Sequence, residues 1–244
     1  MVRACKPASR VAAGFDSPKG VSSYYDRSQS DQTCYCFRKY PDLEINREKS
    51  MAIVAIVYHS GFGHTKLQAE AVHRGAGSVA GVEARLYTSE EGIAKLDELD
   101  QADAIIFGCP TYMGNISADM KKFIEVAGKK WFTQSWKDKV AGAFTNSSSF
   151  SGDKLNTLIG LVINAMQHGM IYVGTGVLPA VSHPESMSST LGPGPEVQNR
   201  LGSFVGAMSA SFQVQPPDAP PPGDIATGEA YGERVAGITL RLAK

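Results

Sequence analysis

The sequence has no excess of charge of either sign, because its 244 residues include 24 lysines and arginines and 24 aspartates and glutamates. No basic block recurs on a helical face, so the electrostatic footprint of a nucleic-acid-binding protein is missing. The longest apolar runs, such as residues 52–58, are far shorter than the roughly 20 residues that cross a bilayer. We therefore expect a soluble protein with a neutral, compact partner and no nucleic acid or membrane partner.

Cysteine is scarce, and Cys5, Cys34, Cys36 and Cys109 do not make a disulfide framework. One residue separates Cys34 from Cys36, which is not metal-ligand spacing, so no metal site is predicted. The apolar patch at residues 11–15 is too short for a signal-peptide core, and early aspartates disfavour a transit peptide. A reducing compartment fits this pattern, and we expect the protein in the cytoplasm.

The chain divides into two regions at Met51. Residues 1–50 lack hydrophobic periodicity and mix serine, proline, glycine and charges, so we interpret them as a disordered or artificial extension. Residues 51–244 form the second region, a single domain. It contains a Pro/Gly-rich insertion at about 183–226, and long loops of this kind are usually functional or disordered.

From Met51 the pattern alternates between strand and helix, which is typical of a parallel sheet covered on both faces. Five strands are predicted, at residues 53–58, 82–87, 104–108, 140–145 and 171–173. Helical spacing predicts helices at about 66–79, from a cap at Ser117, over 155–166 and over 231–242, with a weaker helix near 197–208. The fold class is therefore α/β.

The first predicted strand is joined to its helix by the loop His59-Ser60-Gly61-Phe62-Gly63-His64-Thr65. Ser60 and Thr65 offer hydroxyl groups, and the two glycines let the backbone turn and approach a ligand closely. The start of the helix adds free amides and a positive dipole. This pattern predicts an anion site, although a glycine turn without a ligand remains the alternative. The loop contains no lysine that could bind a triphosphate, so a nucleotide triphosphatase is disfavoured. Lys66 stands where the dinucleotide-binding fingerprint has its third glycine, so that fingerprint is not matched either.

Two further loops follow predicted strands, and loops at the carboxyl ends of parallel strands bind ligands in such sheets. The second loop is Cys109-Pro110-Thr111-Tyr112-Met113-Gly114-Asn115, and its rigid proline and flat aromatic can seat a planar ring. Cys109 has the position of a nucleophile, but no arginine follows it in the loop, so a small buried strand end is favoured. The third loop is Asn146-Ser147-Ser148-Ser149-Phe150-Ser151-Gly152, which is rich in small donors.

Several motifs match one family in register. Ser60 to His64 fits S-x-[YF]-G-H, and Gln167-His168-Gly169-Met170 resembles an H-G-M motif. The more specific match is Pro110-Thr111 followed by Gly114-Asn115, Ser117-Ala118, Met120, Phe123 and Trp131. Together with the terminal helix, these motifs resemble WrbA-type NAD(P)H:quinone oxidoreductases of the flavodoxin-like superfamily. The third loop has less glycine than is usual there, Tyr112-Met113 stands where Arg-Phe is common, and residues 183–223 match poorly.

The resemblance implies a doubly wound five-stranded parallel sheet of order 2-1-3-4-5 with helices on both faces. It also implies FMN as the cofactor. The cofactor-binding residues would be Ser60, Gly61, Phe62, Gly63, His64 and Thr65 at the phosphate; Pro110, Thr111, Tyr112, Met113, Gly114 and Asn115 at the ring; and Asn146, Ser147, Ser148 and Ser149 at its pyrimidine edge. His168 would lie beside the ring as a catalytic residue, or supply only a favourable charge at a helix end. Phe62 and Trp131 would shape a substrate slot, with a core position as the alternative for Trp131.

The implied reaction passes hydride from NADH or NADPH to the flavin and then two electrons to a quinone, in two half-reactions at one site. A homotetramer, or at least a dimer, with sites at subunit contacts is implied as well. Two other readings remain open. The first is a flavodoxin that only carries electrons, which is disfavoured because such carriers are strongly acidic. The second is an FMN-binding regulator or scaffold with an incidental reductase activity.

Overall fold

The computed structural model of the protein describes residues 51–183 and 190–243. The predicted extension over residues 1–50 lies outside the described residues, as do Cys5, Cys34, Cys36 and part of the predicted insertion.

One sheet organises the described chain, and it has seven strands there. They are β1 (Ala52–Tyr58), β2 (Val82–Thr88), β3 (Ala104–Tyr112), β4 (Asn115–Ile116), β5 (Val140–Ser147), β6 (Ile171–Tyr172) and β7 (Ala207–Ala210). The main path is β2-β1-β3-β5-β6, while β4 pairs with β3 and β7 pairs with β5. Among the strands of the described residues, only β3 and β4 pair antiparallel. The main path runs through the five predicted strands, and β4 and β7 are additions that the sequence analysis missed.

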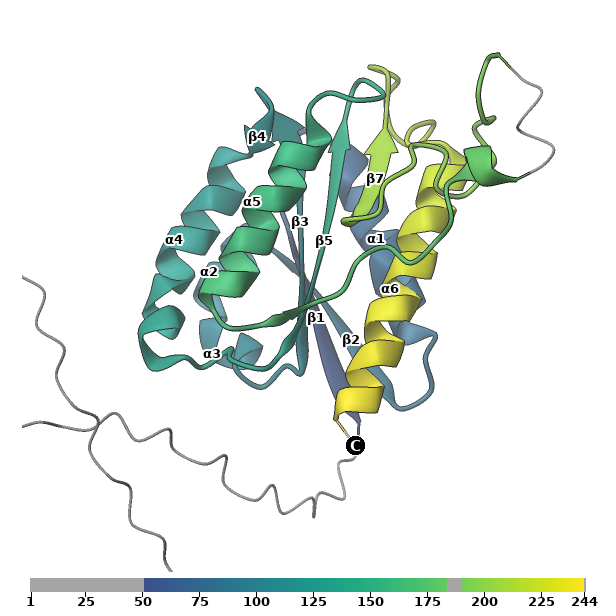
Figure 1. Cartoon of the computed structure of the whole chain (residues 1–244). Coiled ribbons are helices and arrows are strands. Elements are labelled where there is room, and N and C mark those ends of the chain that lie inside the picture. The colour runs from purple at the N-terminus through teal and green to yellow at the C-terminus, as the bar shows by residue number, and fades with distance from the viewer. Residues whose placement is uncertain (1–50, 184–189, 244) are drawn as a thin grey trace, which may run out of the picture. The chain divides into compact units, whose positions relative to one another are not determined.

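Helices cover both faces of the sheet (Figure 1). The long ones are α1 (His64–Gly77), α4 (Ala118–Thr133), α5 (Lys154–Gln167) and α6 (Pro222–Leu242). The short ones are α2 (Ser89–Ala94), α3 (Leu96–Leu99) and a 3-10 turn at Ala180–Ser182. Helices α1 and α6 pack on one face, and α4 and α5 pack on the other. Within the described ranges no helix has both the length and the apolar character that crossing a membrane requires.

An aromatic cluster fills the core under α4. Trp136 is fully buried and stacks on Phe123, with ring centroids 6.3 Å apart, and it lies 6.4 Å from the ring of Phe107. The indole N–H of Trp136 donates to Asp100 Oδ1 at 2.8 Å. A buried tryptophan needs such a partner for its one polar atom, so the ring can contribute its whole apolar area to this core.

On the opposite face, α1 and α6 approach each other through glycines. A Cβ atom built on Gly75 would lie 1.9 Å from the carbonyl oxygen of Glu229, and one built on Gly232 would lie 2.0 Å from that of Val72. No side chain fits at either position. The close approach of the two backbones therefore depends on residues that have no Cβ.

Strand β3 is longer than predicted. We expected it to end at residue 108, but it continues to Tyr112. Met113 and Gly114 both have positive φ, 48° and 70°. Such a two-residue turn returns the chain as an antiparallel partner, so Asn115 and Ile116 form β4 against the end of β3. Part of the predicted second loop is thus a hairpin.

The predicted helix near 197–208 does not form, and β7 occurs there instead. A Cβ on Gly206 would lie 2.1 Å from the carbonyl oxygen of Ala143, so glycine lets the chain reach β5. The N–H of Ala210 donates to Asp224 Oδ2 at 2.9 Å, which fixes the end of the strand. The predicted insertion therefore contains a strand of the main sheet.

The glycine contact between α1 and α6 can be tested by substitution. Gly232→Ala should lower the free energy of unfolding by about 1–3 kcal/mol, because a methyl group must push the helices apart. Gly237→Ala on the same helix is the matched control, since nothing lies within 4 Å of its Cβ position. The control should raise stability by about 0.5–1 kcal/mol, because alanine favours a helix more than glycine does. Urea unfolding followed by circular dichroism measures both, and equal stabilities would contradict the close contact.

Candidate functional site

The three predicted loops meet at the edge of the sheet where β1, β3 and β5 end (Figure 1). They line a cavity of about 510 Å³, which is within the range of roughly 300–1,000 Å³ that is typical of ligand sites. The predicted residues that line it are Ser60, Phe62, His64, Thr65, Pro110, Thr111, Tyr112, Met113, Gly114, Asn146, Ser147, Ser148 and Ser149. Most of the predicted cofactor-binding residues are therefore brought together.

Ser60 organises the first loop. Its Oγ accepts hydrogen bonds from the backbone N–H groups of Gly63 and Lys66, both at 3.1 Å. The backbone N–H groups of Phe62, His64 and Thr65 have no acceptor among the described residues. Free amides and the positive end of the dipole at the start of α1 attract an anion. The loop therefore has the properties of an anion site rather than of a bare glycine turn.

Aromatic side chains from the first and second loops meet at the mouth of the cavity. The rings of Phe62 and Tyr112 lie edge to face with centroids 6.2 Å apart, and both side chains are partly exposed. Gly61 lies against the Tyr112 hydroxyl, since a Cβ on Gly61 would lie 2.5 Å from that oxygen. Met113 is fully exposed beside them. The mouth is thus apolar, and Gly61 keeps the two loops in contact.

Beneath the second loop, three buried threonines share hydrogen bonds. Thr111 Oγ1 lies 2.8 Å from Thr145 Oγ1 and donates to Thr157 Oγ1 at 2.8 Å. Thr145 Oγ1 donates to the carbonyl oxygen of Cys109 at 2.7 Å. These bonds connect the end of β3 to β5 and α5. Burial raises the pKa of the Cys109 thiol to about 11, so the thiol stays protonated at neutral pH and is a buried strand end, not a nucleophile.

A fourth segment of the wall was missed. Ser211, Gln213 and Gln215 also line the cavity, and the carbonyl oxygen of Val214 lies 2.7 Å from His64 Nε2. These residues follow β7, in the region where no motif was visible. Because parallel strands end at the same edge, recognising residues 207–210 as a strand would have placed them at the site.

His168 and Trp131 are not brought to the cavity. Helix α5 begins beside the third loop and has 14 residues, so its end lies about 20 Å away at the opposite edge of the sheet. There His168 is buried against Trp136, with ring centroids 4.5 Å apart. Burial lowers the pKa of His168, which favours the neutral ring over a charge at the helix end.

Trp131 lies near the end of α4, which also begins at the site and runs away from it. Its ring is 40% exposed and packs on Phe132 with centroids 4.8 Å apart. Trp131 is therefore neither in the core nor in the cavity of its own chain. Asn115 belongs to the second loop but accepts a hydrogen bond from Ile116 in the hairpin instead of lining the cavity.

Comparison with known proteins shows the family to which the chain belongs. Residues 49–184 match the model of a family described as NADPH-dependent FMN reductase. The chain is 40% identical to "Flavodoxin FldP" of Pseudomonas aeruginosa over 79% of this chain and 99% of that protein. It is 32% identical to "Quinone-oxidoreductase QR2" of Triphysaria versicolor over 78% of this chain and 96% of the relative. A solved WrbA-like flavodoxin from Agrobacterium tumefaciens is similar with a TM-score of 0.58 and 37% identity, covering 78% of this chain and 98% of that one.

The fold and the site define a flavodoxin-like α/β protein with a parallel sheet and a cavity at its carboxyl edge. The chain belongs to the NADPH-dependent FMN reductase family. The predicted WrbA-type resemblance is confirmed, and so is the prediction of an FMN-dependent oxidoreductase that uses NAD(P)H. The anion site at α1 fits the phosphate of FMN, and the apolar mouth fits a flat ring system.

The role of Ser60 in the anion site can be tested by Ser60→Ala. The substitution removes the acceptor that orders the start of α1, so FMN affinity should fall about fivefold, equivalent to the ~1 kcal/mol that such a cap is worth. The control is Ser78→Ala at the other end of α1, where the hydroxyl donates to Gly75 O at 2.8 Å. Titration of FMN fluorescence measures both. Equal weakening by the two substitutions would show that Ser60 acts only on helix stability.

Proposed function

We propose that the protein transfers two electrons from NADH or NADPH to a quinone, in a ping-pong reaction that uses bound FMN. The observation that carries the proposal is an aromatic-edged cavity next to a set of free amides at a helix start. The first feature suits a flat ring and the second suits its phosphate. The proposal places the enzyme in the reducing cytoplasm, because the sequence has few cysteines and no disulfide framework.

In this proposal FMN lies across the three loops. Ser60, Gly61, Phe62, Gly63, His64 and Thr65 form the phosphate site; Pro110, Thr111, Tyr112, Met113 and Gly114 border the ring; and Asn146, Ser147, Ser148 and Ser149 meet its pyrimidine edge. FMN supplies the capacity to accept a hydride and to pass on two electrons. The protein would bind the cofactor, orient each substrate and stabilise the negative charge of the reduced flavin.

The exposed mouth supports a single substrate slot. Phe62 is 73% exposed and Met113 is fully exposed, so this side of the cavity is open to a second flat molecule. A nicotinamide and a quinone would stack at the same place and could not be bound there together. Alternating occupation of one slot is the physical basis for the ping-pong order.

Steady-state kinetics test the proposed function. FMN-loaded protein should oxidise NADH or NADPH with benzoquinone as acceptor, and double-reciprocal plots at several quinone concentrations should give parallel lines. Intersecting lines would contradict a shared slot. A purified protein that is colourless and cannot take up FMN would overturn the cofactor assignment itself.

An electron carrier is the second candidate, because the relative that is 40% identical is named a flavodoxin. A carrier delivers electrons to protein partners and needs no slot for nicotinamide. Negligible turnover of both nucleotides by FMN-loaded protein would favour this candidate. The balanced charge of the chain supports the enzyme instead, since carriers of this kind are strongly acidic.

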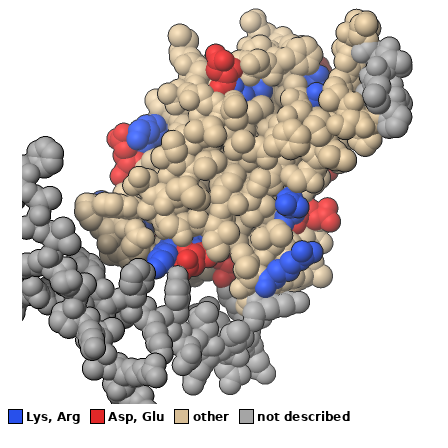
Figure 2. Space-filling model, viewed as in Figure 1, with Lys and Arg blue, Asp and Glu red and all other residues tan. Residues whose placement is uncertain are grey.

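We also propose that the protein is a homo-oligomer, a dimer or a tetramer. Leu155, Ile159, Ile163 and Met166 form an exposed apolar stripe along α5, each at least 40% exposed. Phe204 extends the stripe, and a groove of about 920 Å³ runs beside it. Figure 2 shows this face with its charged residues near the margins. Exposed apolar surface of this kind marks protein contacts, and Trp131 could reach a substrate slot only across such a contact.

The double substitution Ile159→Asp and Ile163→Asp tests the stripe. Two carboxylates in an apolar contact would be desolvated without partners, so the oligomer should dissociate toward a monomer. Leu242→Asp is the control, because this residue is 57% exposed at the end of α6, on the other face of the sheet. Light scattering coupled to gel filtration gives the mass of each variant. An unchanged oligomer in the double variant would exclude this face as the contact.

A further inference from the structure

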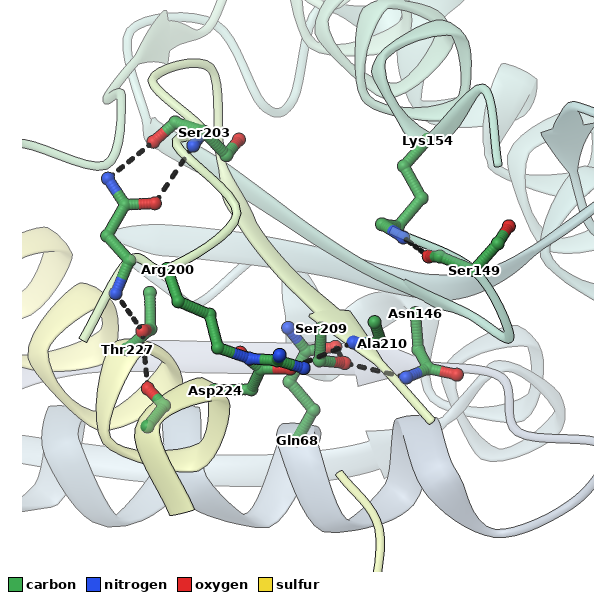
Figure 3. Close-up of polar contacts among 12 residues, drawn as sticks. Gln68, Asn146, Ser149, Lys154, Arg200, Ser203, Ser209, Ala210, Asp224 and Thr227 are labelled. Atoms are coloured by element: carbon green, nitrogen blue, oxygen red, sulfur yellow. Dashed lines mark hydrogen bonds and ion pairs between the residues drawn. The ribbon is translucent and has the colours of Figure 1, made fainter. Parts of the chain in front are cut away.

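Lys154 is the first residue of α5, and its side chain is almost completely buried, with 1% exposed. Lysine is almost never buried in this way without a reason, because the ammonium loses its hydration. Nζ donates to Ser147 Oγ at 2.7 Å and to the carbonyl oxygen of Ser149 at 2.5 Å. Figure 3 shows the side chain directed from α5 toward the loop that carries Ser149. Both acceptors belong to the third loop and line the cavity.

No carboxylate among the described residues forms an ion pair with this ammonium. Asp224 on α6 is the acidic group that acts on Lys154, and it is also buried. Its two oxygens accept from Arg200 at 2.8 and 3.1 Å, and Oδ2 also accepts from the N–H of Ala210 at 2.9 Å (Figure 3). The Arg200–Asp224 pair is therefore balanced, which leaves the charge of Lys154 in excess.

Arg200 is itself fixed on its far side. Its guanidinium lies 5.4 Å from the ring centroid of Phe150 and 5.6 Å from that of Phe212. The two rings pack edge to face with centroids 4.7 Å apart. Arg200 cannot easily leave Asp224, so Asp224 is not free to turn to Lys154.

No lysine or arginine side chain among the described residues lines the cavity, so Lys154 acts on it from behind the third loop. The lining of the cavity, within the described ranges, includes no aspartate or glutamate either. The backbone N–H groups of Ser148 and Ser149 donate to no acceptor among the described residues. Because Lys154 binds Ser147 and the Ser149 carbonyl from behind, it holds the loop in a form that keeps these two amides free. A positive charge and two free donors thus act on the same end of the cavity.

We propose that Lys154 is a positioning residue, which orders the third loop and places one excess positive charge behind it, so that the site binds reduced FMN more tightly than oxidised FMN. The inference rests on the proposed function, in which the third loop meets the end of the flavin where the reduced form gathers negative charge. Burial lowers the pKa of Lys154 to about 8, and the opposed influences of Asp224 and Arg200 act on it in addition. At neutral pH the ammonium is charged.

The test compares the affinities of FMN-free protein for oxidised FMN and for chemically reduced FMN without oxygen. In Lys154→Met the preference for the reduced form should fall about tenfold, which is about 30 mV for a two-electron couple. Lys130→Met is the matched control, because this ammonium lies near the end of α4 and binds Asp97 at 2.6 Å and Asp100 at 2.5 Å. The control should keep the preference of the wild type.

The pH dependence is a second readout that a purely structural role would not move. The excess charge is present below the pKa of Lys154 and is lost above it, so the wild-type preference should approach that of Lys154→Met as the pH rises above 8. Both proteins carry the same Asp224 and Arg200, so the difference between them isolates Lys154. If Lys154→Met does not fold, Lys154→Gln takes its place as the uncharged variant. The pH series of the wild-type protein does not depend on either variant.

The outcomes are distinct. Equal weakening of both FMN forms by Lys154→Met, or a difference that does not change with pH, would overturn the charge role while leaving the proposed function intact. A wild-type protein that binds neither form of FMN would overturn the proposed function, and this inference with it.

Discussion

The hydroxyl of Tyr231 closes a gap in the sheet on which the binding edge depends. Strand β5 pairs with β6 at Val140 and Ala141, and it pairs with β7 only from Phe144 onward. Between these two partners, the N–H of Ala143 donates to the Tyr231 hydroxyl at 2.9 Å, and the hydroxyl donates to Val173 O at 2.7 Å. Burial raises the pKa of this phenol to about 12, so it remains a donor. Without it, a buried amide of the central strand would have no partner where β5 changes neighbours.

The change of neighbour matters because the residues that follow β7 form the fourth segment of the cavity wall. A buried polar chain fixes that strand in place (Figure 3). Ser209 Oγ donates to Gln68 Oε1 on α1 at 3.1 Å and accepts from Asn146 Nδ2 at 2.8 Å. Gln68 lies one turn after the anion site, and Asn146 lies at the start of the third loop. The chain of bonds therefore holds the two ends of the cavity in a fixed relation, which a ligand with a phosphate at one end and a ring at the other requires.

Much of this arrangement was predictable from local pattern. The strands buried on both faces, the amphipathic helices and the three loops all follow from short-range periodicity and turn residues, and the structure brings the loops together. Strand β7 was not predictable in this way, because its four residues, Ala207 to Ala210, lie in a Pro/Gly-rich stretch and gain their conformation from β5. His168 and Trp131 were placed at the site by the family resemblance, which also implies an oligomer with sites at subunit contacts. Within one chain, the helices that start at the site carry their last residues away from it, so local pattern alone could not show how these two side chains lie relative to the cavity.

The buried lysine shows why stability alone does not explain the third loop. Its pKa is lower in the folded chain than the ordinary 10.5, so the unfolded chain binds the proton more tightly and the charged group opposes folding at neutral pH. This opposition weakens only as the pH rises from about 8 toward 10.5, where the ammonium is no longer charged in either state. An apolar side chain at position 154 would avoid the desolvation. The fold instead keeps the cation, leaves the neighbouring carboxylate to Arg200, and holds the charge behind a loop of a cavity whose described lining has no charged side chain of lysine, arginine, aspartate or glutamate. In the arrangement that we propose, an anionic flavin in that cavity offsets the cost of the buried charge.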